Sequence, residues 1–380
     1  MNNEKIKEKE LVTAIAIGCG QRGLNVYGAF AKKYPKKLKF IACVDIDKKK
    51  TKQFAKQHNI PSQYSFTSED ARFQQPKFAD AVYICTPDRF HEDTTIKALE
   101  KGYHVFLEKP MASSKEGCEK IIKKAKETNA ILMVGFVLRY SPLFAKIKEL
   151  IQENKIGDIV SIKHSENMGY WVYAHSFARS KVYTQSPAIL QKGSHDFDLI
   201  FWYANANPKK ISSFAMPNLS TSSVPLPESI PDRCIEGCPR SKECIFNALP
   251  MYLQGTPILL DNSRSEFFLI RNIFKLAIKH PKLARILIPP LKSMKLVPWR
   301  QWPVDQITED LSEEGIKKAL RETPFGLCIY KIKDAQPISQ ITVIQFENGI
   351  TASFTLQGLS YRDGREIRID GTKGTIKGYF

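Results

Sequence analysis

The segment that most constrains the fold covers residues 12–23 and reads VTAIAIGCGQRG. An apolar run that stops at a glycine is typical of a buried strand, and the pattern after Gly23 is helical. In this spacing Gly18 permits a tight turn, Gly20 lets the main chain approach a pyrophosphate, and Gly23 lets the next helix pack closely. A second apolar run ends at Asp45. In dinucleotide-binding folds an acid about 20 residues after the glycines binds a ribose 2′-hydroxyl, and Asp45 lies near that position. Together they favour a dinucleotide site over a strand-turn-helix with purely structural glycines.

Strands and helices alternate after this segment. Further apolar runs end near Cys85, Leu107 and Phe136, and each is followed by a helical pattern. This alternation predicts a parallel, doubly wound sheet, whose ligands lie at the carboxyl ends of the strands. The residues that fall at such ends are Thr86, Pro87 and Lys109.

Length and composition favour two domains in a soluble protein. A chain of 380 residues exceeds one ordinary core, so we expect a polar tail at 1–10, a Rossmann domain at 11–138 and a second domain at 139–380. The first ten residues lack the apolar core of a signal peptide, and no uncharged run reaches the ~18 residues of a membrane span. We therefore expect a cytoplasmic location, where thiols stay reduced.

The formal net charge of +18 raises the question of a nucleic-acid partner. Between Arg264 and Arg300 the sequence has nine Lys or Arg and one acid, Glu266, so this short stretch carries +8 of the charge. No recognition-helix, zinc-finger or RNA-binding signature accompanies it, so we predict no nucleic-acid partner.

The same stretch contains a basic amphipathic helix. One face carries Ile270, Ile273, Phe274 and Ala277, and another carries Arg271, Lys275, Lys279 and Lys282. Such a helix can lie on an anionic membrane surface through residues 264–300. More often it packs against its own domain or a second subunit, and we favour that interpretation.

Five motifs in order carry a family resemblance. They are GCGQRG, Asp45, CTPDRFH (85–91), EKP (108–110) and GFVLRYSP (135–142). This order resembles the Gfo/Idh/MocA family of NAD(P)-dependent oxidoreductases, which implies a Rossmann domain followed by an α/β domain built on a large, mostly antiparallel sheet. The resemblance also implies that Lys109 contacts nicotinamide and substrate. The cofactor, NAD with NADP also allowed, would be bound by Gly18, Gly20, Gln21, Arg22, Gly23, Asp45, Thr86, Pro87, His91, Glu108 and Lys109.

His195 is the candidate base of the second domain. Removing a hydride from a secondary alcohol requires a base for the hydroxyl proton, and histidine has a suitable pKa range. The ammonium of Lys109 would favour the alkoxide-like transition state. The alternative for His195 is a hydrogen-bonded helix cap near the start of a helix expected over 194–203.

The surroundings of His195 depart from the family pattern. Many members place an aspartate four residues before this histidine, whereas this chain has Gln191 followed by Lys192. The segment KGSHDFD resembles a little-characterised branch of the family, so we expect Lys192 to take part of the polar work. Asp198 could orient His195 from the next turn, or it could be an exposed surface acid.

The cysteines of the second domain suggest a structural metal. Cys234, Cys238 and Cys244 are clustered in RCIEGCPRSKECIF, and Cys328 is a candidate fourth ligand of a tetrahedral site. The spacing matches no common finger or ribbon, and the alternative is a loop of free or redox-active thiols.

These features define three candidate functions. The first is an NAD(P)-dependent oxidoreductase, acting as a homo-oligomer on a sugar, polyol or related small hydroxylated molecule. The second is an NAD-dependent glycosidase that uses transient oxidation, and the third is a non-catalytic dinucleotide-binding protein. Family members continue past the G-T-K-G-like segment (371–374) with a further strand and helix, so we expect the second domain to be cut short at Phe380.

Overall fold

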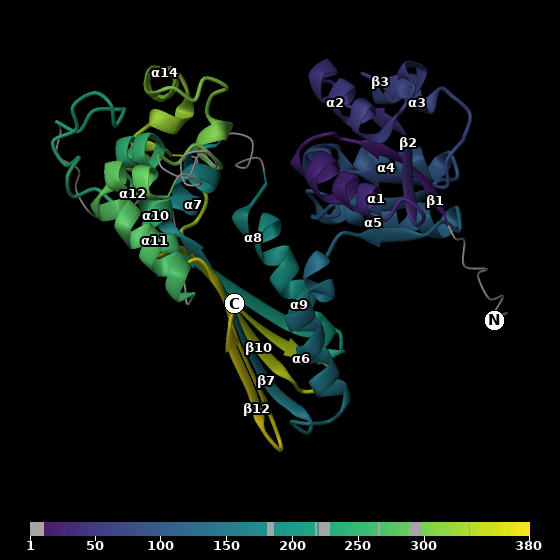
Figure 1. Ribbon diagram of the computed structural model, residues 1–380. Coiled ribbons are helices and arrows are strands. Elements are labelled where there is room, and N and C mark those ends of the chain that lie inside the picture. The colour runs from purple at the N-terminus through teal and green to yellow at the C-terminus, as the bar shows by residue number, and fades with distance from the viewer. Residues whose placement is uncertain are drawn as a thin grey trace. The chain divides into compact units, whose positions relative to one another are not determined.

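The computed structural model of the chain describes residues 11–180, 186–216, 219, 229–264, 267–288, 298–333 and 335–380. The chain divides into two compact units, one ending at Val137 and the other running from Leu138 to Phe380 (Figure 1). The predicted polar tail lies outside the described residues. Within the described residues, no helix combines the length and the apolar character needed to cross a membrane.

The first unit is built on a six-stranded parallel sheet, as the sequence predicts. The order is β3-β2-β1-β4-β5-β6, the arrangement of a dinucleotide-binding Rossmann fold. The two-residue β3 is too short to show a period in the sequence. The strands are β1 (Val12–Ile17), β2 (Leu38–Val44), β3 (Ser65–Phe66), β4 (Ala81–Ile84), β5 (His104–Leu107) and β6 (Leu132–Val134).

Helices cover both faces of this sheet. Along β1, Ala14 and Ala16 belong to the apolar cluster that includes Phe54 of α2, whereas Ile15 and Ile17 belong to the cluster formed with α4 and α5. Successive side chains of a strand point to opposite faces, so one strand contributes to both cores. The helices are η1 (Gly23–Gly28), α1 (Ala29–Lys33), α2 (Lys48–His58), α3 (Glu69–Phe73), α4 (His91–Glu100) and α5 (Lys115–Glu127).

The second unit is built on a mixed, mostly antiparallel six-stranded sheet. Its order is β12-β11-β7-β10-β9-β8, and β7 and β10 form the parallel pair. The predicted strand from 159 continues to Gly169, because its buried positions keep alternating beyond His164. The strands are β7 (Ile159–Gly169), β8 (Pro208–Met216), β9 (Ser339–Phe346), β10 (Thr351–Ser360), β11 (Gly364–Gly371) and β12 (Thr375–Tyr379).

Helices pack on one face of this second sheet. Leu199 and Ile200 of α9 are fully buried in the core that includes Ile162 and Phe354 of the sheet. On the other face Ile341 and Val343 of β9 remain about half exposed, and the edge strand β8 is exposed along its length. The helices of this unit are α6 (Pro142–Gln152), α7 (Tyr170–Val172), α8 (Ala188–Gln191), α9 (Gly193–Ala204), α10 (Thr256–Asn262), α11 (Phe268–Lys279), α12 (Pro281–Leu287) and α14 (Glu313–Glu322).

Candidate functional site

Two of the three motif glycines are required by close packing. Gly18 has φ +90°, and a Cβ there would lie 2.6 Å from the carbonyl carbon of Cys85 and 2.8 Å from the nitrogen of Thr86. A Cβ on Gly23 would lie 2.2 Å from the carbonyl oxygen of Gly18. Any larger residue at either position would therefore displace the turn from β4 or the helix from the turn.

Gly20 differs, because a Cβ there would meet no atom within 4 Å. The carbonyl oxygen of Gly20 accepts a hydrogen bond from the amide of Leu24 at 2.9 Å, so the helix starts directly after it. The amides of the first helical turn have no acceptor within the helix and carry the positive end of its dipole. The open space over Gly20 and these amides fit a pyrophosphate.

Asp45 lies where β2 ends, beside the glycine turn. Its Oδ2 accepts a hydrogen bond from the amide of Cys19 at 2.8 Å, and its Oδ1 accepts one from the amide of Asp47 at 2.9 Å. These bonds hold the carboxylate at the rim of the turn. Each carboxylate oxygen can accept more than one hydrogen bond, so capacity remains for ribose hydroxyls.

Glu108 and Arg22 form a polar cluster beneath the loop that carries Lys109. The carboxylate of Glu108 is buried, and its Oε1 accepts hydrogen bonds from Arg22 Nε at 2.6 Å and from the Tyr27 hydroxyl at 2.5 Å. Burial and the nearby Glu108 charge raise the pKa of Tyr27 above its usual range. Glu108 Oε2 accepts the amide of Lys109 at 3.2 Å. Glu108 thus positions both Arg22 and the backbone of Lys109.

His91 connects two of the predicted loops. Its ring nitrogens lie 2.7 Å from the carbonyl oxygen of Pro110 and 2.9 Å from that of Thr86, and the side chain is buried. The imidazole therefore joins the loop after β4 to the loop after β5. Pro87 is exposed beside them, and Lys109 is half-buried. The first unit thus gathers the predicted cofactor residues at the carboxyl ends of its strands.

In the second unit, His195 lies in the first turn of α9 and is partly exposed. Lys192 precedes it by three residues and is the N-cap of α9. The ammonium of Lys192 is 3.2 Å from Oε1 of Glu166. Lys109 belongs to the first unit and His195 to the second.

The interpretation of Asp198 as an exposed acid is wrong. Its side chain is 9% exposed, and both of its oxygens accept hydrogen bonds from Arg139, from Nε at 2.7 Å and from Nη2 at 2.6 Å. A bidentate pair of this kind has a fixed geometry. Asp198 therefore anchors α9 to the 137–140 turn, a partner that the sequence-based hypothesis did not include.

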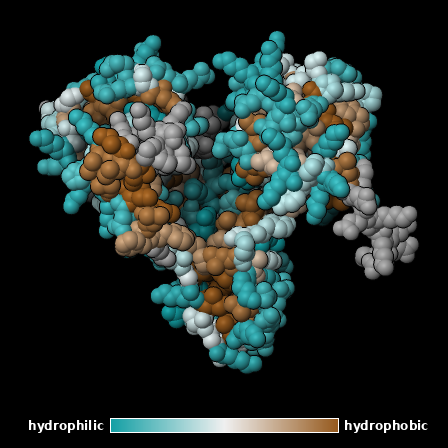
Figure 2. All heavy atoms as spheres, viewed as in Figure 1, coloured by the Kyte–Doolittle hydropathy of each residue, from teal (hydrophilic) through white to brown (hydrophobic). Residues whose placement is uncertain are grey.

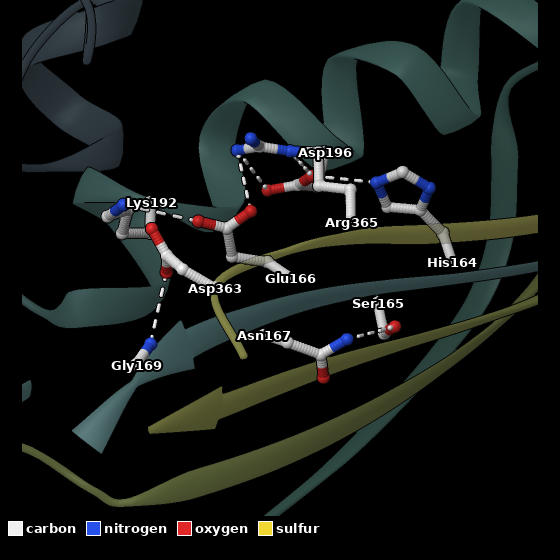
Figure 3. Close-up of polar contacts among 9 residues, drawn as sticks. All are labelled: His164, Ser165, Glu166, Asn167, Gly169, Lys192, Asp196, Asp363 and Arg365. Carbon is white, nitrogen blue, oxygen red and sulfur yellow. Dashed lines mark hydrogen bonds and ion pairs between the residues drawn. The ribbon is translucent and has the colours of Figure 1, made fainter. Parts of the chain in front are cut away.

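A buried charge network lies beside Lys192 (Figure 3). Asp196 is fully buried, and its Oδ1 lies 2.7 Å from His164 Nε2 and 2.7 Å from Arg365 Nε. Arg365 Nη2 lies 2.9 Å from Oε2 of Glu166, whose other oxygen contacts Lys192. The carboxylate can only accept, so Nε2 of His164 carries a proton. The network thus links the N-terminal end of α9 to β7 and β11.

The two carboxyls of the network are perturbed in opposite directions. Burial opposes ionisation of Asp196, but the hydrogen bond from His164 and the charge of Arg365 outweigh it and lower the pKa of Asp196. For Glu166 burial prevails over the attraction of Lys192 and Arg365, so its pKa is raised. Perturbed carboxyls that share charged partners are common at functional sites.

Sequence reasoning missed His164, Glu166, Asp196 and Arg365. A signal for the first two was present, because His164 and Glu166 occupy buried positions of an alternating strand, where apolar side chains are usual. Arg365 pairs with Glu166 in the register of β11 and β7, and only the strand pairing reveals that.

The four predicted cysteines line one cavity of about 240 Å³ in the second unit. Within the parts of the chain that the structure describes, no group of three or more histidine, cysteine, aspartate or glutamate side chains is placed to hold a metal ion. Burial raises the pKa of Cys244 and of Cys328, so without a metal both thiols are neutral. The structure therefore gives no support to a metal bound by the four predicted cysteines, which are Cys234, Cys238, Cys244 and Cys328.

Comparison with known proteins identifies the family. Residues 12–136 match an oxidoreductase family with an NAD-binding Rossmann fold, and residues 148–261 match the C-terminal alpha/beta domain of that family. The chain belongs to the Gfo/Idh/MocA family. The motifs of the first unit and the mixed sheet of the second are the features of this family that the sequence predicts.

Two curated relatives illustrate the range of names among the proteins that this chain resembles. The inositol 2-dehydrogenase/D-chiro-inositol 3-dehydrogenase of Halalkalibacterium halodurans is 25% identical over 194 residues, 49% of this chain and 53% of that protein. The 2,7-anhydro-N-acetylneuraminate hydratase of Escherichia coli is 32% identical over 124 residues, 33% of each chain. These matches thus span between a third and about half of the relatives' lengths.

A solved structure shares the fold of this chain. Scyllo-inositol dehydrogenase from Lactobacillus casei, with bound NAD(H) and scyllo-inositol, aligns with a TM-score of 0.57 and 16% identity over 97% of this chain and 76% of that chain. At this level of identity the similarity supports the fold alone.

Proposed function

We propose that this protein is an NAD-dependent oxidoreductase that transfers a hydride between nicotinamide and a CH–OH group of a sugar, polyol or related small molecule. The observation that carries the proposal is the glycine turn, where Gly20 faces open space beside the first helical amides and Asp45 is held at the rim. Its family membership and the inositol dehydrogenases among its relatives agree with it.

This proposal gives a role to Lys109, His195 and Lys192. NAD, when bound, supplies the hydride acceptor. His195 takes the hydroxyl proton of the substrate, and the ammonium of Lys109 stabilises the developing negative charge. Lys192, oriented by Glu166, binds a substrate hydroxyl or assists His195.

The cofactor preference follows from Asp45. A carboxylate at this point accepts from ribose hydroxyls and repels a 2′-phosphate, so we propose NAD rather than NADP. Lys48, Lys49 and Lys50 begin α2 nearby and reduce the repulsion. Of these, Lys50 has its Nζ 4.0 Å from Oδ2 of Asp47, and this carboxylate partly offsets the charge of Lys50.

The test is a screen of sugars and polyols with NAD, followed through the absorbance of NADH. Wild-type protein should reduce NAD with at least one compound, and His195→Ala should lower this turnover about 10²-fold or more while still binding NAD in calorimetry. The exposed His280→Ala is the matched control and should retain wild-type turnover. Equal turnover of His195→Ala and wild type on that compound would exclude His195 as the base.

A glycosidase that uses transient oxidation is the second candidate. The observation that favours this candidate is the relative named as a hydratase, because that relative is not named as a dehydrogenase. Release of the aglycone from aryl glycosides, dependent on NAD but without accumulation of NADH, would identify this activity. NAD binding with neither activity would instead identify a non-catalytic dinucleotide-binding protein.

We also propose that the protein forms homo-oligomers through the uncovered face of the second sheet. Phe214, Ile341 and Val343 are 76%, 50% and 47% exposed there, and Phe214 pairs directly with Ile341. Exposed apolar patches of this kind mark interaction surfaces. In sedimentation velocity, Ile341→Lys/Val343→Lys should reduce the mass of the assembly, and a wild-type mass for this variant would exclude the face.

A further inference from the structure

The helices α11 and α12 leave an unusual number of large apolar side chains exposed. Phe267, Phe268 and Leu269, at the start of α11, are 72%, 71% and 70% exposed. Ile286 and Leu287, at the end of α12, are 72% and 61% exposed. Figure 2 shows hydrophobic residues gathered on the surface over α10 to α12. Scattered single exposures are normal, whereas a group of this size marks an interaction surface.

These exposed residues are not the packing face of the helices. Phe274 and Ala277 of α11 are buried together with Ala284 of α12 and Leu259 of α10 in a small core. The helices therefore pack against their own unit through one face, as the sequence analysis favoured. The exposed apolar residues form an additional surface that this core does not account for.

Cations accompany the exposed apolar side chains. In α11, Lys275 and Lys279 follow Phe268 by seven and eleven positions, so the three side chains lie on one helix face. All three are exposed. Lys282 at the start of α12 is also exposed. The sequence from Arg264 to Arg300 carries nine cations and one acid. Apolar side chains beside lysines are the composition of helices that lie at a membrane interface.

We propose that this basic apolar surface of α11 and α12 docks on an anionic phospholipid bilayer. Phe267, Phe268 and Leu269 would enter the boundary between headgroups and acyl chains, while Lys275 and Lys279 would contact lipid phosphates. With twelve residues, α11 is far shorter than the ~20 residues that a membrane-spanning helix needs. The helix therefore lies on the membrane surface rather than across it.

Charge decides between a bilayer and a second copy of this chain. A two-fold interface brings the same patch of both copies together, so it would oppose two sets of lysines. Like charges that face each other across an interface weaken association, whereas an anionic bilayer attracts every one of them. The same cations that disfavour self-association at this surface therefore favour the membrane.

The experiment is co-sedimentation of the full chain with vesicles. Vesicles of phosphatidylcholine with phosphatidylglycerol should bind the protein, and added salt should weaken binding because surface charges are screened. Phe267→Ser/Phe268→Ser should reduce the partition coefficient about tenfold or more, since two apolar rings lose their burial. Lys275→Gln/Lys279→Gln should reduce it about fivefold for each lysine.

Matched variants separate this surface from general effects. Lys123→Gln/Lys126→Gln removes two exposed lysines of α5, and Ile122→Ser/Ile131→Ser removes two exposed apolar residues of the first unit. Both controls should bind as the wild type does, and all variants should keep its thermal unfolding.

Three results would overturn the proposal. The first is equal binding to pure phosphatidylcholine, and the second is an equal loss in the controls. The third is that Phe267→Ser/Phe268→Ser lowers the oligomer mass without changing vesicle binding, which would assign the surface to a protein contact. NAD binding of each variant, measured by calorimetry, tests the proposed oxidoreductase function independently of membrane binding.

Discussion

Replacing Asp196 by asparagine tests the buried charge network directly. The substitution keeps the shape of the side chain but removes a negative charge that lies 2.7 Å from both His164 Nε2 and Arg365 Nε. Removing one partner of a buried ion pair costs about 3–5 kcal/mol, because the remaining charge stays buried without compensation. Arg365 still contacts Glu166 at 2.9 Å, so we expect the lower end, about 3 kcal/mol.

The assay is thermal unfolding by calorimetry. For a unit of the size of Leu138–Phe380, each kcal/mol shifts the melting temperature by about 2–4 °C, so Asp196→Asn should melt about 6–12 °C below the wild type. Asp93→Asn makes the same chemical change on an exposed face of α4 and should alter stability by less than about 0.5 kcal/mol. If Asp196→Asn has the same melting temperature as Asp93→Asn, the network does not stabilise the fold as inferred.

The pH dependence gives a second check on the same variant. The folded-state pKa of Asp196 is lowered, so its contribution to stability is complete above the unfolded value of about 3.9 and is lost as the pH falls toward the folded value. The difference in melting temperature between wild type and Asp196→Asn should therefore narrow below about pH 4. A constant difference from neutral to acidic pH would contradict the assigned ionisation.

Three further predictions concern cofactor and catalysis. Gly20→Ala should keep wild-type thermal stability but weaken NAD binding in calorimetry about tenfold or more. Gly18→Ala should instead lower the melting temperature, because Gly18 has a φ of +90° and its new Cβ would lie 2.6 Å from the carbonyl carbon of Cys85. Equal effects of the two substitutions on stability would contradict this assignment. Asp45→Ser should shift the ratio of the dissociation constants for NAD and NADP toward NADP, and an unchanged ratio would show that Asp45 does not select the cofactor. Lys109→Ala and His195→Ala should each lower turnover about 10²-fold or more in steady-state kinetics, with loss of NAD affinity mainly for Lys109→Ala; near-normal turnover of either variant would remove that residue from the mechanism.

Local patterns account for what sequence reasoning identified in the first unit. The apolar run before Gly18, the glycine spacing and the acid at Asp45 are all encoded within short segments, and the structure places them together at one edge of the sheet. The carboxyl ends of parallel strands meet at such an edge, so strand order alone predicts where a ligand would bind. The environment of Glu108 was not predictable, because its partners Arg22 and Tyr27 come from another strand-helix unit.

The second unit shows where sequence reasoning stops. The helix with His195 and the alternating strands near the end of the chain were predictable from their periods. The pairing of Asp198 with Arg139, 59 residues away, was not, since no local pattern links a helix residue to a preceding turn. The four predicted cysteines line one cavity, but their thiols are not arranged as a metal site.

The sequence by itself therefore determined the longer elements of the first unit, the parallel sheet and the glycine turn, because strand period, helix period and glycine conformations act over a few residues. Only the tertiary structure decided which charges are buried together. Arg365 reaches Asp196 across 169 residues, and that contact depends on β11 pairing with β7 and on α9 packing over the sheet. A buried charge is stable only with its partner, and such partners are chosen by strand register and helix packing rather than by neighbours in the chain.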